Sequence, residues 1–167
     1  MNCEAQFKQQ LEQLQQFVTD EKAATLQQLE SVWLKNLDAK LTTGQTQAIS
    51  GLQQIDKHSI RAQLGDNESR YREGDIVRLY LDDPLTGTSL TQLRIETVHE
   101  DEWLLRAHQL NTDSFRELKD GCFADPCFID LEGLYQKALS EVAAMHIGRS
   151  IILPLLAGQL ENNLVDE

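Results

Sequence analysis

A long apolar stripe near the N-terminus is the feature that most constrains how this chain can fold. Its members recur at helical spacing and share one helix face; they are Phe7, Leu11, Leu14, Val18, Leu26, Leu29, Trp33 and Leu37. A helix from Glu4 to about Leu41 would extend roughly 50 Å, at about 1.5 Å per residue. A compact core of this chain's size cannot cover that length, so we predict that part of the helix projects as a stalk.

Two features bear on where this helix breaks and ends. Polar residues thin the stripe between Val18 and Leu26, and Thr19 offers a cap, so a break near Thr19 is one alternative. Gly44 ends the pattern, because glycine is common just past a helix C-terminus. A helix folded back on the domain and a coiled-coil dimer are the alternatives to a projecting stalk.

The middle of the chain carries short strand patterns separated by turn signals. The predicted strands are Ala48–Ile55, Ser59–Leu64, Ile76–Leu81, Leu90–His99 and Trp103–Ala107. About five strands are too few for two covered sheets, so we expect a small closed barrel. The stretch from Asn111 to Asp125 shows little pattern beyond Phe115 and Leu118 and is interpreted as a polar loop.

A second helix-spaced pattern follows the strands. Its apolar members are Leu134, Tyr135, Ala138, Leu139, Val142 and Met145, and Asp130 is a candidate N-cap. An apolar run after Gly148 contains Pro154, which fits the first turn of a new helix. We predict that these C-terminal helices pack on the first helix; the residues at this contact are Leu34, Leu37, Leu139, Ile152 and Leu155.

Together the patterns predict an α+β protein. A helical stalk of two or three helices carries a small antiparallel β-barrel of about five strands. The predicted parts are an N-terminal stalk at 4–43, a barrel at 44–128, C-terminal stalk helices at 129–158 and a tail at 159–167. A chain of 167 residues can bury a core without metals or disulfides.

Charge and cysteine usage limit the classes of function. The chain has 15 basic and 27 acidic residues, and its net charge of -12 opposes the phosphate attraction behind most nucleic-acid binding. Three cysteines make no disulfide framework and no apolar leader opens the chain, so we expect a cytoplasmic location. The apolar run Ile151–Ala157 is too short to span a bilayer, so no membrane partner is predicted.

The sequence shows no constellation typical of catalysis. No Gly-Lys dipeptide occurs, so the phosphate-binding loop that phosphoryl transfer requires is missing. Cys122 and Cys127 lack two further metal ligands nearby and are interpreted as ordinary buried or half-buried thiols. We therefore expect no catalytic residue, no cofactor and no metal in this chain.

Most of the arginines fall among the predicted strands, together with Tyr71 and Tyr80. Arginine and aromatic residues on a small barrel can bind single-stranded nucleic acid by phosphate pairing and base stacking. Interspersed acidic residues are equally typical of an ordinary solvated surface, so that alternative stays open. The candidate contacts are Arg70, Arg72, Arg78 and Arg94. For the isolated chain we expect a Kd above roughly 10⁻⁴ M.

The order of these pieces resembles the N-terminal accessory region of superfamily 1B helicases, the group that includes the nonsense-mediated-decay helicase and the immunoglobulin mu-binding helicase. The resemblance covers Leu11 to Gly158. It rests on the Ser69–Leu81 string with Gly-Asp-Ile-Val-x-Leu-Tyr, the helix Leu134–Leu139 and the segment Ile151–Gly158. It implies a barrel on a helical stalk that modulates the grip of a RecA-like motor domain on single-stranded DNA or RNA.

We therefore expect a non-catalytic accessory domain of a superfamily 1B helicase. Its partners would be the RecA-like motor domain, which hydrolyses ATP in the parent protein, and single-stranded nucleic acid, bound weakly by the isolated chain. The motor would begin near Glu167, so the chain is interpreted as an N-terminal piece or a motorless relative. The alternative is a self-contained protein-protein interaction module that uses its long amphipathic helix.

Overall fold

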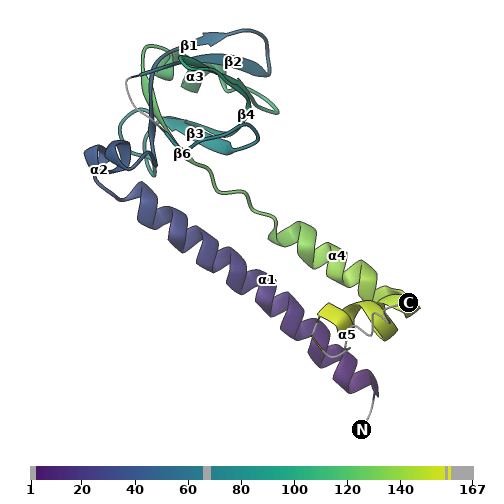
Figure 1. The fold of residues 1–167 in the computed structure, drawn as a ribbon. Helices are drawn as coiled ribbons and strands as arrows, with labels where there is room; N and C mark the ends of the chain where they lie inside the picture. Colours follow the sequence, from purple (N-terminus) through teal and green to yellow (C-terminus); the bar gives the residue numbers. More distant parts are fainter. Residues whose placement is uncertain (1–2, 66–68, 157, 159–167) are drawn as a thin grey trace, which may run out of the picture. The chain divides into compact units, whose positions relative to one another are not determined.

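The computed structural model describes residues 3–65, 69–156 and 158, and it shows an α+β chain (Figure 1). The chain divides into two compact units. The helical unit comprises Met1–Thr25 and Asp130–Glu167, and the barrel unit comprises Leu26–Ile129. The predicted tail at 159–167 lies outside the described residues.

Helix α1 (Cys3–Trp33) runs without a break through Thr19, so the alternative of a break there is wrong. The predicted extension to about Leu41 is also wrong, because a short second helix, α2 (Leu37–Thr42), follows after a gap. Asn36 causes this restart: its side chain accepts a hydrogen bond from the Asp38 N–H at 2.9 Å. The last turn of α1 is fixed within the barrel unit, where the Trp33 indole N–H donates to the Pro126 carbonyl at 2.9 Å.

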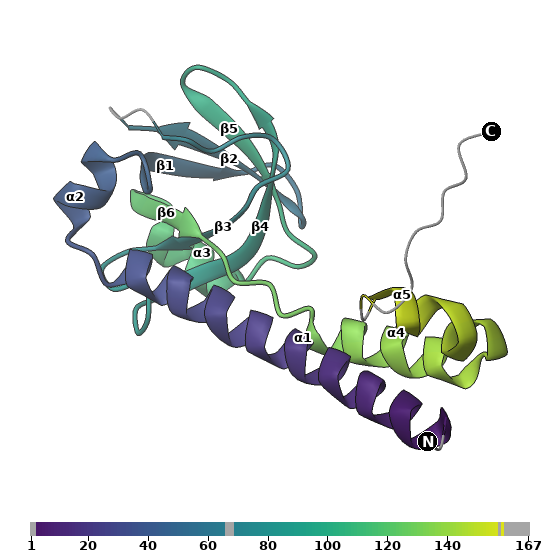
Figure 2. The ribbon, with the colours of Figure 1, turned by 60° about the horizontal axis from the view of Figure 1, so that its bottom comes forward.

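The barrel unit contains a closed antiparallel barrel, as predicted, but with six strands and not five (Figure 2). The strands are β1 (Gln47–Gln54), β2 (Ser59–Leu64), β3 (Ile76–Tyr80), β4 (Ser89–Val98), β5 (Glu102–Arg106) and β6 (Cys122–Pro126). Their order around the barrel is β1-β2-β5-β4-β3-β6. The register shifts within the β1–β2, β3–β4 and β4–β5 pairs, and such bulges bend strands at barrel corners.

Alternation along the strands fills the barrel interior with apolar side chains. Fully buried residues at every second position include Ile60 and Ala62 on β2, and Trp103 and Leu105 on β5. The same alternation places arginines on the outer face: Arg94 lies between the buried Leu93 and Ile95, and Arg106 follows Leu105. The core therefore requires these basic side chains to face solvent.

The region interpreted as a polar loop in fact contains helix α3 (Thr112–Leu118) and strand β6. Asn111 caps α3 by accepting from the Asp113 and Ser114 N–H groups at 3.0 and 3.2 Å. Leu118 is buried in the barrel core and Phe115 packs against it. Strand β6 pairs with both β1 and β3 and so closes the barrel.

The helical unit joins the first part of α1 to helix α4 (Glu132–Ala144) through polar contacts. The Lys22 ammonium lies 2.7 Å from an Asp130 carboxylate oxygen and 2.8 Å from a Glu132 carboxylate oxygen. Thr19 donates to Glu132 at 2.8 Å, and the Gln136 amide donates to the Gln15 carbonyl at 2.9 Å. The N-cap of α4 is Leu131 and not the predicted Asp130, although the Asp130 carboxylate accepts a hydrogen bond from the Glu132 N–H at 3.1 Å.

After α4 the chain turns through a π-helical turn, η1 (Gly148–Ile152), into the short helix α5 (Leu153–Leu156), which contains Pro154. Leu153 is fully buried. Leu34, one of the predicted contacts, is 71% exposed and belongs with Leu37 to the barrel unit. The predicted packing of Ile152 and Leu155 on those two residues therefore stays a prediction.

Candidate functional site

The four arginines predicted to contact nucleic acid lie on three segments of the barrel unit. Arg70 and Arg72 are exposed in the segment before β3. The backbone N–H of Arg72 donates to an Asp75 carboxylate oxygen at 2.8 Å. Arg78 is half-buried on β3 and Arg94 is exposed on β4. Arg94 lines a polar hollow in the barrel surface.

Arg78 stacks on Trp33. Its guanidinium carbon lies 4.8 Å from the centre of the indole ring, an arrangement that attracts a cation to the ring face. The Arg78 Nε is buried and has no hydrogen-bond partner among the residues that the structure describes. Trp33 is at the end of α1 and is only 7% exposed, and Arg78 is on β3. Their stacking therefore joins α1 to the barrel wall.

A polar hollow of about 740 Å³ lies over strands β4 and β5; its lining residues are His58, Gln92, Arg94, Glu96, Arg106, Ala107 and His108. Arg94 and Arg106 are direct partners across the β4–β5 ladder. Arg94 forms an ion pair with Glu96 at 3.7 Å. Arg106 forms no ion pair with any residue in the described part of the chain.

A second hollow, of about 390 Å³, shares His58 and His108 with the first. Its remaining lining residues are Gln54, Lys57, Gln109, Leu110 and Thr112. The strand ends hold the two histidines in place, because the Ala107 N–H donates to the His58 carbonyl at 2.8 Å. The two hollows together form a surface with three basic side chains, which we call the basic strip; its charged members are Lys57, Arg94, Arg106 and Glu96.

Sequence reasoning missed Arg106, His58, His108 and Lys57. The hairpin turn alone does not reveal Arg106, because the turn pairs Val98 with Trp103, and only the register shift between Ile95 and Thr97 brings Arg94 opposite Arg106. The histidines carried no comparable signal, because they lie in connections after β1 and β5 whose proximity depends on β2–β5 pairing.

A buried polar network links α2 to the barrel. The Lys40 ammonium contacts an Asp125 carboxylate oxygen at 2.6 Å and the Tyr80 hydroxyl at 2.8 Å. Thr46 donates to the other Asp125 oxygen. Burial raises the pKa of Tyr80 far above its usual range, and the nearby Asp125 carboxylate adds to that rise. The network is enclosed, since Lys40 is 2% exposed and Asp125 is 0% exposed, so it serves structure and not binding.

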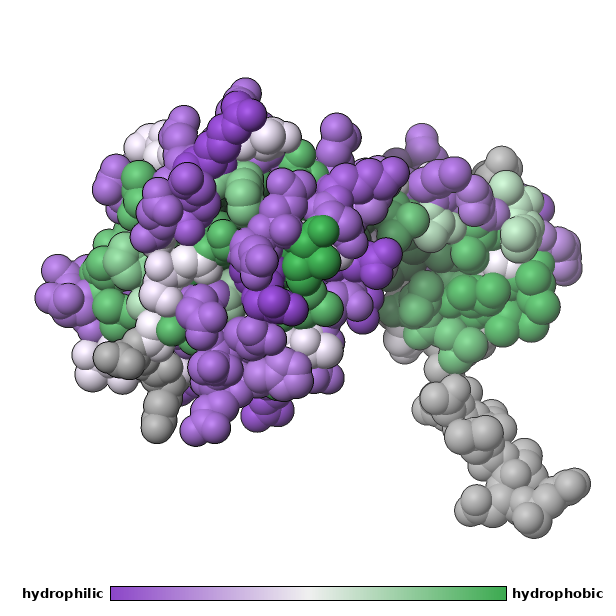
Figure 3. Space-filling view, turned by 90° about the horizontal axis from the view of Figure 1, so that it is seen from above, coloured by the Kyte–Doolittle hydropathy of each residue, from purple (hydrophilic) through white to green (hydrophobic). Residues whose placement is uncertain are grey.

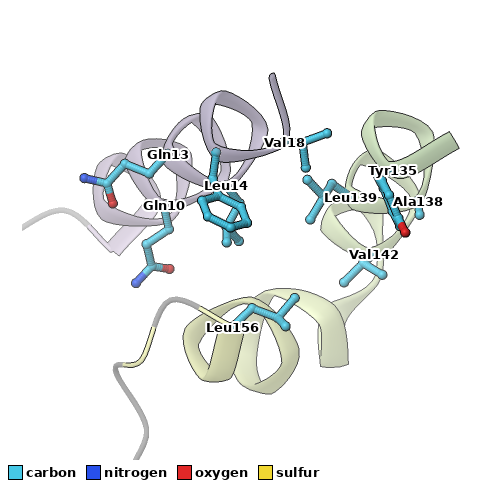
Figure 4. Close-up of a pocket in the computed structure, with 10 residues that line it drawn as sticks. Gln10, Gln13, Leu14, Val18, Tyr135, Ala138, Leu139, Val142 and Leu156 are labelled. Carbon is cyan, nitrogen blue, oxygen red and sulfur yellow. The ribbon is translucent and has the colours of Figure 1, made fainter. Parts of the chain in front are cut away.

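The helical unit carries an apolar groove between α1, α4 and α5 (Figure 4). Its volume is about 530 Å³, and its lining residues are Gln10, Gln13, Leu14, Phe17, Val18, Tyr135, Ala138, Leu139, Val142 and Leu156. Leu14 and Val18 face Leu139 and Leu156 across the groove (Figure 4). Leu139 therefore lies opposite the first part of α1, within the helical unit.

Large apolar side chains also remain exposed on this unit. The most exposed are Leu134 at 63%, Phe17 at 60% and Leu156 at 60%. The space-filling view shows a broad apolar area on the helical unit (Figure 3). In the described residues no single helix is long and apolar enough to cross a bilayer, although the pair Glu132–Ala144 and Gly148–Leu156, bent by 108°, meets that length and composition test together.

The two cysteines of the barrel unit are free thiols. Burial raises the pKa of Cys122 to about 12, and it also raises the pKa of Cys127, whose sulfur accepts from the Gln92 N–H at 3.3 Å. The described residues contain no group of three or more His, Cys, Asp or Glu side chains placed to hold a metal ion.

The fold and these surfaces define a class of α+β protein in which a closed antiparallel barrel is inserted between the two parts of a helical unit. Comparison with known proteins adds no family, since no family model, curated protein or solved structure matches this chain.

Proposed function

We propose that the chain is a non-catalytic accessory domain of a superfamily 1B type helicase. In this proposal the helical unit docks on a RecA-like motor domain, and the barrel unit modulates the motor's grip on single-stranded DNA or RNA in the cytoplasm. The motor hydrolyses ATP, and this chain supplies neither a catalytic group nor a cofactor.

The exposed apolar face of the helical unit carries the proposal. Phe17 and Leu156 line an apolar groove and are each 60% exposed, and Leu134 of the same unit is 63% exposed, whereas the barrel encloses its own core. Contiguous exposed apolar surface marks a protein interaction site. A motor domain is a partner that would cover such a face, and the order helix, barrel, helix agrees with that assignment.

Testing this function begins with the DNA directly downstream of the Glu167 codon. We expect it to encode a helicase motor. The purified motor should change its single-strand-stimulated ATPase rate when this chain is added in trans. Absence of an encoded motor, or an unchanged rate at saturating chain concentration, would count against the proposal.

Matched variants make the test specific for the helical unit. Phe17→Asp with Leu156→Asp places charge on the exposed apolar face and should abolish the effect on the motor. Ile55→Asp is the control, because Ile55 is 49% exposed but lies in a turn of the barrel unit. An equal loss in both variants would show that the apolar face is not the docking surface.

The same exposed face also favours a second candidate, a self-contained interaction module in which two copies pair through α1. Sedimentation at micromolar concentration separates the two candidates. A dimer that dissociates in the Phe17→Asp, Leu156→Asp variant supports pairing of two copies. A strict monomer supports docking of the apolar face on a different protein.

A further inference from the structure

We propose that the basic strip binds successive phosphate groups of a single-stranded nucleic acid. Arg94 and Arg106 would hold one phosphate, and Lys57 would hold another. The choice of nucleic acid as the source of phosphate rests on the proposed function. The choice of this surface rests on the geometry of the barrel unit.

The first argument is charge. In a chain of net charge -12, the residues that line the strip include three basic side chains and one carboxylate, that of Glu96; a second carboxylate, that of Asp56, lies beside the strip and accepts from the His58 N–H at 2.7 Å. Like charges directly opposite on a ladder repel, so the Arg94–Arg106 pair costs stability unless an anion lies between them. A guanidinium presents its N–H groups as a fork that matches two phosphate oxygens. Glu96 offsets Arg94 only, since Arg106 has no ion-pair partner in the described chain.

The second argument is shape. A single small anion would need one hollow, whereas here two hollows adjoin and share His58 and His108. An extended polyanion can follow both and keep the imidazoles as hydrogen-bond partners between its phosphates. Of the described residues that line the strip, none is Phe, Tyr or Trp, so the strip lacks a platform for base stacking. We therefore infer a grip on the backbone that does not depend on base sequence.

The number of cations limits the affinity. Neutralising two phosphates gives a salt dependence with a log-log slope of about -1.4, at roughly -0.7 for each phosphate of a single strand. The protein's own negative charge opposes binding further. The strip is thus a weak contact that becomes useful when a docked motor already holds the strand.

The test is a titration of the ¹⁵N-labelled full chain with a short deoxythymidine oligonucleotide at low salt, followed by amide NMR. We expect the largest shifts at His58, Arg94, Arg106 and His108. The Arg94→Gln, Arg106→Gln variant should bind at least about tenfold more weakly, and the size of its salt slope should fall by roughly 0.7, the value for one phosphate. All three basic side chains of the strip lie on the barrel surface, and the dispersion of the free spectrum checks that the fold is retained.

Arg70→Gln with Arg72→Gln is the matched control, because it removes the same charge from exposed positions outside both hollows. Equal weakening in the two double variants, shifts centred on Arg70 and Arg72, or no shifts at all would overturn the assignment. Inorganic phosphate forms a further arm. If it binds the same amides as tightly as the oligonucleotide does, the strip is a site for one phosphate group and the extended strand is wrong.

These outcomes are separate from those of the docking test. Loss of oligonucleotide binding would leave the effect on the motor intact if docking depends on Phe17 and Leu156. Loss of docking would leave the amide shifts in the free chain unchanged.

Discussion

At the scale of single residues, Lys40 shows how the barrel unit tolerates a buried charge. An ammonium group moved out of water costs several kcal/mol unless it is paired and hydrogen-bonded. Lys40 meets both conditions through Asp125 at 2.6 Å and Tyr80 at 2.8 Å. Thr46 holds the remaining Asp125 oxygen, so each member of the network orients the next.

Removing the Lys40 ammonium should therefore leave the Asp125 carboxylate as a buried, unpaired charge, which lowers the stability of the fold. We predict that Lys40→Met lowers the free energy of unfolding by about 3–5 kcal/mol, because it leaves the Asp125 carboxylate buried without its cation. Urea unfolding followed by Trp fluorescence measures this change. Lys57→Met, at an exposed lysine of the same unit, is the control and should change stability by less than about 0.5 kcal/mol.

Restoring the balance provides a second check on the same network. Combining Lys40→Met with Asp125→Asn should recover part of the lost stability, since no buried charge then remains. A double variant less stable than Lys40→Met alone would contradict this account of the pair.

At the scale of elements, sequence reasoning succeeded where local signals and packing agree. The alternation in β2 to β5 and the turns between them predicted four strands closely, because buried and exposed positions follow the period of two. It failed for β6, whose five residues include the buried Asp125 and end in Pro126. Local propensity opposes a strand there, and partners far apart in sequence, Lys40 and Thr46, make it favourable.

The turn after α4 requires glycine at position 148, because there is no room for a side chain there. A Cβ built on Gly148 would lie 1.8 Å from the Val142 carbonyl oxygen, which is backbone and cannot move aside. We predict that Gly148→Ala destabilises the helical unit by about 1–3 kcal/mol, the usual cost of overpacking. Helical circular dichroism during thermal unfolding measures it. Gly133→Ala in the first turn of α4 is the control: nothing lies within 4 Å, and stability should stay equal or rise by up to about 1 kcal/mol.

The contact between α1 and the start of α4 should depend on pH. The hydrogen bond from Lys22 lowers the pKa of Asp130 below its usual 3.8 and that of Glu132 below its usual 4.5. These carboxylates therefore contribute stability above those usual values and lose it as pH falls through the lowered ones. Their hydrogen bonds, that of Asp130 first, raise the Lys22 pKa above 10.5, so the lysine contributes below that value and its contribution is lost at higher pH.

We predict that the melting temperature of the helical unit falls on acidification from neutral pH to about pH 3, and that Lys22→Met removes part of this fall. Circular dichroism melts at several pH values test it. Lys8→Met is the control, because Lys8 meets Glu12 only at 3.9 Å on an exposed helix face. A full acid-dependent fall in the Lys22→Met variant would show that other groups govern it.

At the scale of the whole molecule, the two units differ in self-sufficiency. The barrel unit is one continuous segment, Leu26–Ile129, and encloses its own core. The helical unit is made of two segments that precede and follow the barrel unit in the sequence. The order helix, strands, helix could be predicted from periodicity. The basic strip could not, because it depends on which strand ends the closed barrel brings together.

We predict that residues 26–129 fold when expressed alone. The excised unit should unfold cooperatively and keep the amide spectrum that its residues show in the full chain, with Trp103 buried as it is there. Amide NMR of both proteins provides the comparison. Shifts spread throughout the excised barrel, or a non-cooperative transition, would mean that the barrel needs the helical unit.

The interrupted helical unit has a consequence for biosynthesis. Thr19 and its partner Glu132 are separated by 113 positions. At roughly 5–20 residues per second, a ribosome reaches Glu132 on the order of 5–20 seconds after it has added Thr19. During that interval the apolar stripe of α1 has no partner helix, and the barrel cannot close until its last strand, β6 (Cys122–Pro126), has been made. The nascent chain therefore passes through a stage in which its earliest helix is a target for chaperones. That stage ends when α4 has been translated and can pair with α1.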